Sequence, residues 1–149
     1  KSKRVLNLGC ASGSSHQRIK SVATSIVGVD KHQPCDLELD LNAFAPRLIG
    51  DYDIIIAGEI LEHLDCPGLL LDCLRHNNSQ MIITVPNAFH VAGLRWMKDG
   101  YEQVNPDHVA WYSYRTMKTL LERYCFSIQE FYWYNGKPLT AEGMIFVVN

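Results

Sequence analysis

Residues 5–13 read Val5-Leu6-Asn7-Leu8-Gly9-Cys10-Ala11-Ser12-Gly13, and this stretch is the strongest indication of the fold in the sequence. Its apolar first half predicts a buried strand, and the glycines that follow predict a tight turn. Ser14 or Ser15 can cap a helix that begins directly afterwards. Because glycine lets a ligand approach the backbone closely, a strand, a turn and a helix N-terminus in this order favour a nucleoside-binding site.

A second apolar strand, expected at 26–29, ends in Asp30. An acidic side chain at that place can bind both hydroxyls of a ribose. The glycine fingerprint of dinucleotide-binding sites, GxGxxG, is incomplete, because Ala11 and Ser14 stand at its second and third glycine positions. The two features together predict a nucleoside cofactor that carries no pyrophosphate.

The composition is that of a globular domain, with 149 residues of which 47% are hydrophobic and 20% charged. The net charge is −2 and the basic residues cluster only at Lys1, Lys3 and Arg4, so nucleic acid is a disfavoured partner. The five cysteines form no CxxC pair, which indicates reduced thiols and a cytoplasmic location. No apolar run has the length of a membrane span. The oligomeric state has no signature in the sequence.

Strand and helix patterns alternate along the chain, which predicts an α/β fold with a doubly wound, mostly parallel sheet. The last two strands are joined by a short turn around Gly136, so they are expected to be antiparallel. The first expected helix would bury Ile19, Val22 and Ala23, and Asp65 and Ser113 would cap later helices. Seven strands are expected at 5–8, 26–29, 35–39, 53–57, 80–85, 126–134 and 144–148, with helices at 15–23, 42–49, 67–75 and 114–124.

We therefore expect residues 1–149 to form one domain. The first expected strand follows almost directly on Lys1, which leaves open whether N-terminal helices are missing. The stretch 87–112 is predicted to be irregular and is too long for a plain connection. Its aromatic residues would either cover a bound substrate or cap the sheet. In the strand after the last helix, Tyr132, Trp133 and Tyr134 are expected to be core or sheet-face residues rather than site residues.

Several motifs, in this order along nearly the whole chain, resemble those of class I S-adenosylmethionine-dependent methyltransferases, in the small-molecule (type 11/23-like) branch. The motifs are Val5–Gly13, Val27-Gly28-Val29-Asp30, Asp40-Leu41, the run from Tyr52 to Leu64 with its Leu-Glu-His-Leu tail, Val85-Pro86-Asn87, and His108 ahead of the Ser113 helix. The resemblance implies a Rossmann-like methyltransferase fold and S-adenosylmethionine as cofactor.

The resemblance also implies the cofactor contacts. Asp30 would bind the ribose hydroxyls, with Lys31 on the adenine side, and the segment after Gly58 would adjoin the transferable methyl. Asn7 stands where the family usually has an acid and Ala11 where it usually has glycine, so we expect cofactor binding to persist more weakly. The full set of expected cofactor-binding residues is Asn7, Gly9, Ala11, Gly13, Asp30, Lys31, Asp40, Leu41, Ala57, Gly58 and Glu59.

Catalysis is expected from Glu59, His63 and His108. On a helical turn, Glu59, Glu62 and His63 would share one face. Three interpretations stay open: a histidine acts as general base, the four residues hold a divalent metal, or the Glu-His pair is structural. The metal interpretation follows a resemblance to ribose 2′-O-methyltransferases that act on small-RNA ends. We assign no metal site from the sequence.

The predicted function is methyl transfer from S-adenosylmethionine to a small-molecule or glycan acceptor, with oxygen slightly favoured as the acceptor atom. Two alternatives stay open. One is a metal-dependent RNA ribose 2′-O-methyltransferase, and the other is a non-catalytic cofactor-binding domain of a larger protein.

Overall fold

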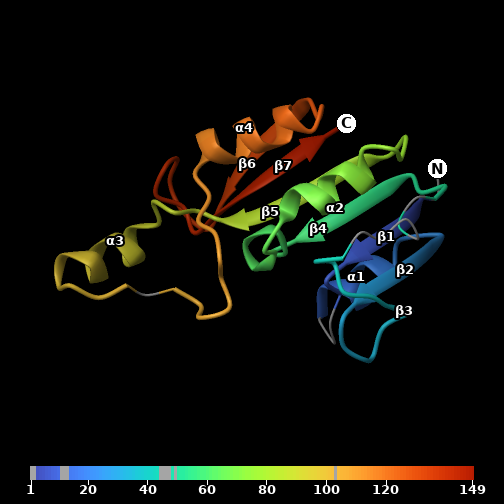
Figure 1. Cartoon of the computed structure of the whole chain (residues 1–149), viewed down its shortest axis with the longest axis horizontal. Helices are drawn as coiled ribbons and strands as arrows, with labels where there is room; N and C mark the ends of the chain where they lie inside the picture. The colour runs from blue at the N-terminus through green and yellow to red at the C-terminus, as the bar shows by residue number, and fades with distance from the viewer. Residues whose placement is uncertain (1–2, 11–13, 44–47, 49, 103) are drawn as a thin grey trace.

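The computed structural model describes residues 3–10, 14–43, 48, 50–102 and 104–149. These residues form one seven-stranded sheet with the strand order β3-β2-β1-β4-β5-β7-β6 (Figure 1). The five strands from β3 to β5 in this order are parallel, and β7 runs antiparallel to both β5 and β6. The predicted α/β, mostly parallel sheet is thereby confirmed. The strands are β1 (Arg4–Leu8), β2 (Ser25–Asp30), β3 (Leu37–Glu38), β4 (Ile54–Gly58), β5 (Gln80–Pro86), β6 (Ile128–Tyr134) and β7 (Gly143–Val148).

The centre of the sheet brings the carboxyl ends of three strands together. Leu8 at the end of β1 pairs with Val29 of β2 on one side and with Ala57 of β4 on the other. The strand order reverses between β1 and β4, and ligands of open α/β sheets bind at such a switch point. The turns after these three strands therefore form the natural place for a site.

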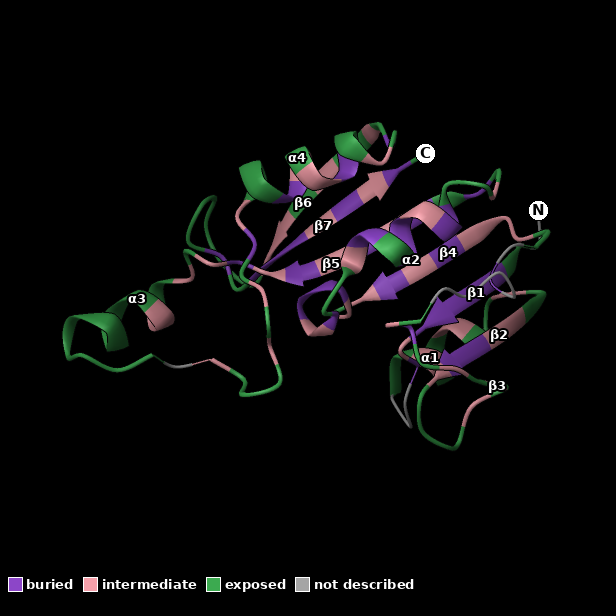
Figure 2. Ribbon diagram, in the orientation of Figure 1, coloured by how far each residue is buried: buried purple, intermediate pink, exposed green. Residues whose placement is uncertain are grey.

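One apolar cluster holds the sheet and two of its helices together. It contains Leu6, Ile55 and Ile83 from the central strands, all with no exposed surface, and Leu71 and Leu121 from the helices. Continuous β-branched residues in β4 fit a strand that is covered on both faces. Figure 2 shows the buried residues along the central strands and on the helix faces turned toward these strands. The helices are α1 (Ser14–Lys20), α2 (Pro67–Leu74), α3 (Val91–Lys98), α4 (Tyr114–Arg123) and the 3-10 helix η2 (Leu61–His63).

The helix ends confirm one of the three predicted caps, since Ser14 and Ser15 lie inside α1 rather than ahead of it. Ser113 accepts a hydrogen bond from the Thr116 backbone N–H, and the Thr116 side chain accepts one from the Ser113 backbone N–H, which forms a capping box at α4. The Asp65 prediction is wrong, because Cys66 is the N-cap of α2 and makes no side-chain cap. Pro67 at the first helical turn supplies a preset φ there instead.

The first helix is shorter and less buried than predicted. α1 ends at Lys20 and none of its residues is buried. Val22 belongs to the turn that leads into β2, where its N–H bonds to the carbonyl of Ile19, and it is 80% exposed. The expected buried face of Ile19, Val22 and Ala23 is therefore wrong. The expected helix at 42–49 falls largely on residues 44–47 and 49, which lie outside the described residues.

The stretch 87–112 is not wholly irregular, because it contains α3, none of whose residues is buried. The two ends of this stretch are held together by a bridge between Asn87 and Tyr112 and by the Ala88 N–H, which bonds to the Tyr112 carbonyl. The Asn87 amide also donates to the carbonyls of Leu139 and Ala141. The segment between these ends projects from the sheet, with α3 at its far side (Figure 1). Among the described residues, no helix is both long and apolar enough to span a membrane.

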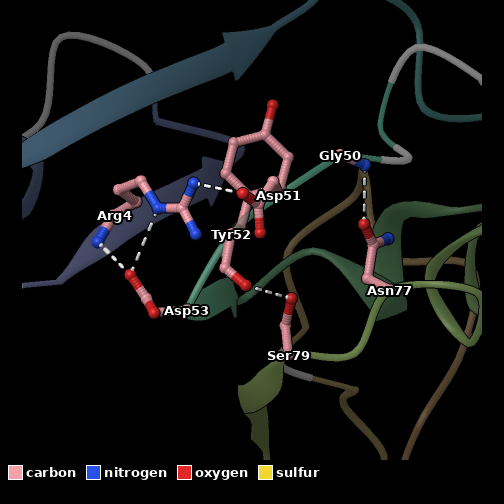
Figure 3. A network of polar contacts seen from close by, with 7 residues as sticks. All are labelled: Arg4, Gly50, Asp51, Tyr52, Asp53, Asn77 and Ser79. Carbon is pink, nitrogen blue, oxygen red and sulfur yellow. Dashed lines mark hydrogen bonds and ion pairs between the residues drawn. The ribbon is translucent and has the colours of Figure 1, made fainter.

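A polar network links Arg4 of β1 with residues of the segments that lead into β4 and β5 (Figure 3). The Arg4 backbone N–H donates to Asp53 Oδ2 at 2.7 Å, and the Ser79 hydroxyl donates to the Tyr52 carbonyl at 2.7 Å. Arg4 also pairs with Asp51, but exposed ion pairs of this kind contribute little stability. Since this network lies at the amino ends of the strands, we interpret it as structural.

Candidate active site

A cavity of about 560 Å³ lies at the carboxyl ends of β1, β2 and β4. This volume is within the usual range for a small-molecule site. Six of the predicted cofactor contacts line it, together with the predicted catalytic residue His63. The lining residues are Gly9, Asp30, Lys31, His32, Leu39, Asp40, Leu41, Asn42, Glu59, Ile60, His63, Leu64 and Asp107. Because these predicted cofactor contacts line it, we call it the cofactor cavity.

The turn after β1 requires glycine for two reasons. Gly9 has a φ of 65°, and its N–H bonds to the Val29 carbonyl at 2.8 Å. A Cβ added to Gly9 would lie 1.9 Å from Cδ1 of Ile60, so the β1 turn packs directly against the segment after β4. The other two predicted turn contacts, Ala11 and Gly13, lie outside the described residues.

Acidic residues mark the β2 end of the cavity. Asp30 Oδ1 accepts a hydrogen bond from the His32 N–H, and Asp40 Oδ1 accepts one from the Asn42 N–H. These bonds stabilise the loops after β2 and β3. One end of the cavity is lined by Asp30, Lys31, Asp40 and Leu41 of these loops. A ribose and a base would meet hydrogen-bond acceptors and the apolar Leu41 side chain there.

Three predicted contacts do not line the cavity: Asn7, Ala57 and Gly58. Asn7 is 5% exposed, and its amide lies 3.2 Å from Nδ1 of His16, so it is engaged inside the protein. Ala57 is packed in the core at 1% exposure, because successive strand residues face opposite sides of the sheet.

The Glu59 carboxylate is held by residues from two other strands. Its Oε1 accepts hydrogen bonds from the Thr84 hydroxyl at 2.8 Å and from the Tyr134 hydroxyl at 3.0 Å. Its backbone has a φ of 53°, and its N–H bonds to the Thr84 carbonyl at 3.0 Å. Tyr134, expected on the sheet face from its strand position, thus contacts a residue that lines the cavity. No local pattern indicates either partner, since they lie 25 and 75 residues from Glu59 in the sequence.

Glu62, His63 and His108 form a tight group whose potential ligand atoms all lie within 4.8 Å of one another. The Val109 and Ala110 N–H groups bond to the Glu62 carbonyl, and this backbone contact brings His108 to His63. Glu59 is not part of this group. The expectation that Glu59, Glu62 and His63 share a helical face is wrong, because Glu59 has left-handed backbone geometry ahead of η2.

Burial perturbs the ionisation of this group. Glu62 is 1% exposed, and neither of its carboxylate oxygens has a hydrogen-bond partner among the described residues. Its burial, together with the nearby charge of Glu59, raises the pKa of Glu62 to about 7. Burial and the neighbouring His63 lower the pKa of His108, so this imidazole is neutral at pH 7. Nδ1 of His63 lies 3.1 Å from the Asp107 carbonyl, which leaves Nε2 free of that contact.

A second cavity, of about 510 Å³, lies on the other side of the histidines. His63 lines the cofactor cavity and His108 lines this one, and their rings meet edge to face with centroids 4.5 Å apart. The imidazole pair therefore stands between the two cavities. The lining residues of the second cavity are Pro86, Asn87, Ala88, His90, Ala92, Gly93, Val104, Asn105, His108, Ala110, Trp111, Tyr112 and Glu142. Because a predicted acceptor would have to lie across the histidines from the cofactor, we call it the acceptor cavity.

Comparison with known proteins decides the family. A methyltransferase-domain family model matches residues 1–130. The chain belongs to this methyltransferase family. No curated protein matches the chain. The protein is thus an S-adenosylmethionine-dependent methyltransferase, and the glycine turn, Asp30 and the 560 Å³ cavity fit its cofactor.

Solved structures share the methyltransferase fold at low sequence identity. An S-adenosylmethionine-dependent methyltransferase from Archaeoglobus fulgidus is 16% identical with a TM-score of 0.74, over 99% of this chain and 86% of its own. The magnesium protoporphyrin IX methyltransferase of Synechocystis, with bound S-adenosylhomocysteine, is 15% identical with a TM-score of 0.70, over 99% and 73%. The small RNA methyltransferase HEN1 is 17% identical with a TM-score of 0.79, over 100% of this chain and 23% of its own.

Proposed function

We propose that this methyltransferase transfers the methyl group to a hydroxyl oxygen of a small molecule or glycan, with the His63–His108 pair receiving the proton. The observation that carries the proposal is the position of the two imidazoles, one facing each cavity and both in contact. A donor in one cavity and an acceptor in the other would meet beside them.

The strand order supports one direction for the bound cofactor. Asp30 would bind the ribose hydroxyls, and Lys31, Asp40 and Leu41 would adjoin adenine at the β2 and β3 end. Since β1 and β4 follow in the sheet, the methionine part would run over Gly9 toward Glu59. The methyl group would then point to the histidines and the acceptor cavity.

The chemistry of a hydroxyl acceptor matches the neutral imidazole. S-adenosylmethionine supplies an activated methyl group, so this chain has to align the acceptor and accept its proton as the new C–O bond forms. His108 faces the acceptor cavity and its lowered pKa keeps it neutral, so we assign it as the base. Trp111 and Tyr112 offer flat walls, and Glu142 offers a hydrogen-bond acceptor, for a sugar or an aromatic ring.

The test is methyl transfer by a His108→Gln variant. Tritium transfer from methyl-labelled S-adenosylmethionine to a panel of glycosides and phenols identifies a working acceptor. With it, we expect His108→Gln to lower kcat by about 100-fold or more, with cofactor affinity unchanged, because general-base catalysis contributes at least that much. The matched control is His76→Gln, which alters an exposed histidine away from the site. A kcat within about twofold of the wild-type value for His108→Gln would exclude the base.

A second candidate is metal-dependent 2′-O-methylation of RNA ends. The observation that favours it is the Glu62 carboxylate, which is buried without a partner among the described residues and adjoins two imidazoles. Carboxylate and imidazole ligands suit manganese, cobalt or zinc. The fold shared with HEN1 agrees with it, whereas the net charge of −2 does not favour a polyanionic acceptor. In the same assay, short RNA would then accept tritium, and a chelator would abolish transfer until Mn²⁺ is added.

A further inference from the structure

Tyr134 reaches the site from the far edge of the sheet. It is the last residue of β6 and lies beyond the 1–130 segment that the family model matches. β7 and β5 separate β6 from β4 in the sheet, yet the Tyr134 hydroxyl donates to Oε1 of Glu59 at 3.0 Å. A contact across two intervening strands needs an unobstructed path for the ring.

Gly143 provides that path. It pairs with Tyr134 across β6 and β7 and with Pro86 across β7 and β5. A Cβ added to Gly143 would lie 2.2 Å from both Cζ and the hydroxyl oxygen of Tyr134. The ring therefore lies directly over the glycine, and any larger residue at 143 would displace it. The contact between Tyr134 and Glu59 therefore depends on glycine at position 143.

The contact fixes one oxygen of Glu59 and leaves the other available. Thr84 and Tyr134 both donate to Oε1, and Oε2 has no hydrogen-bond partner among the described residues. Burial, then the charge of Glu59, raise the pKa of Tyr134, so its hydroxyl remains a proton donor at neutral pH.

The cofactor carries a positive sulfonium, and its demethylated product does not. Asn7 at the carboxyl end of β1 supplies no charge to face the sulfonium, because its amide is neutral, buried and close to His16. At the β4 end of the cavity the lining carboxylates are Glu59 and Asp107. Glu59 is the one that neighbouring strands hold in place, which suits it to face a fixed charge.

We propose that Tyr134 is a positioning residue that, with Thr84, aims the Glu59 carboxylate at the sulfonium, so that the site prefers S-adenosylmethionine to S-adenosylhomocysteine. This inference rests on the cofactor direction given under the proposed function. A fixed carboxylate attracts a cation but not a neutral thioether, and the attraction grows as the ligand displaces water from the cavity. During turnover, S-adenosylhomocysteine would therefore be replaced readily by a new molecule of S-adenosylmethionine.

The experiment is calorimetric titration of the full chain with each ligand separately, without any acceptor. We expect Glu59→Gln to weaken S-adenosylmethionine binding by about fivefold to tenfold and S-adenosylhomocysteine binding by less than about twofold. Tyr134→Phe should also weaken S-adenosylmethionine binding selectively, with about half the change in binding free energy. Thr84→Val removes the other hydroxyl donor to Glu59 and should have a similar effect. The matched control is Tyr132→Phe, which removes an exposed hydroxyl from the same strand that bonds to Glu130 instead.

Asp30→Asn separates this inference from the proposal beneath it. Both ligands carry a ribose, so this variant should weaken both equally. If it does so while Tyr134→Phe weakens neither ligand or both alike, the positioning role of Tyr134 is overturned and the cofactor direction stands. If Asp30→Asn weakens neither, the cofactor direction and the inference both fail. Thermal unfolding of each variant shows that a selective loss does not come from misfolding, because misfolding would weaken both ligands.

Discussion

Replacing Gly9 by alanine is expected to lower the affinity for S-adenosylmethionine by more than about 100-fold, which corresponds to roughly 3 kcal/mol. An alanine at a φ of 65° costs about 1–2 kcal/mol. Its Cβ would also lie 1.9 Å from Cδ1 of Ile60, so Ile60 must move at the wall of the cofactor cavity. Calorimetric titration measures the affinity, and thermal unfolding measures the accompanying loss of stability.

Gly100→Ala is the matched control for this substitution. Gly100 has a φ of 78°, but nothing lies within 4 Å of an added Cβ. This variant therefore isolates the backbone cost, and we expect a stability loss of about 1 kcal/mol with unchanged cofactor binding. Wild-type affinity in Gly9→Ala would show that the β1 turn does not contact the cofactor.

The second large effect is expected at Glu62, as a pH dependence of stability in the presence of a chelator. Its pKa is about 7 in the folded protein, whereas a glutamate in an unfolded chain has the ordinary value of 4.5. Between these values the folded state keeps a proton that the unfolded state has lost, so stability falls as the pH rises and levels off above pH 7. Between pH 5 and pH 8, the free energy of unfolding of the wild-type protein should fall by about 2–3 kcal/mol more than that of the Glu62→Gln variant.

Urea unfolding at both pH values measures this difference, and Glu102→Gln, at an exposed glutamate, is the control. The titratable groups that face Glu62 are Glu59, Tyr112, Tyr134 and the two histidines of the cluster. Equal pH dependence in wild type and Glu62→Gln would mean that Glu62 is not buried as described. If Mn²⁺ restores at pH 8 the stability that the wild-type protein has lost, this result would support the metal-dependent candidate, because a bound cation stabilises the ionised carboxylate.

The sequence predicts those parts of the fold that depend on residues close together in the chain. The β-branched run in β4, the capping box of Ser113 and the strand-turn pattern that ends at Gly9 all follow from a few adjacent side chains. Asp30 follows from its place at the end of β2. These features could be predicted because strand period, turn and cap chemistry are local.

Other parts of the site depend on contacts that no local pattern contains. Tyr134 reads as an ordinary strand residue, and only the passage over Gly143 brings it to Glu59. The spacing of Glu59, Glu62 and His63 suggests one helical face, but the left-handed backbone of Glu59 separates it from the other two. α3 escaped prediction because its eight residues contain apolar side chains on several sides and bury none of them.

The most direct test of the account is a crystal structure of this chain with S-adenosylhomocysteine. We predict that the ribose hydroxyls bond to Asp30, that the homocysteine lies over Gly9 toward Glu59, and that its sulfur faces the His63–His108 pair. A nucleoside bound outside the cofactor cavity, or a homocysteine directed away from both histidines, would contradict the account.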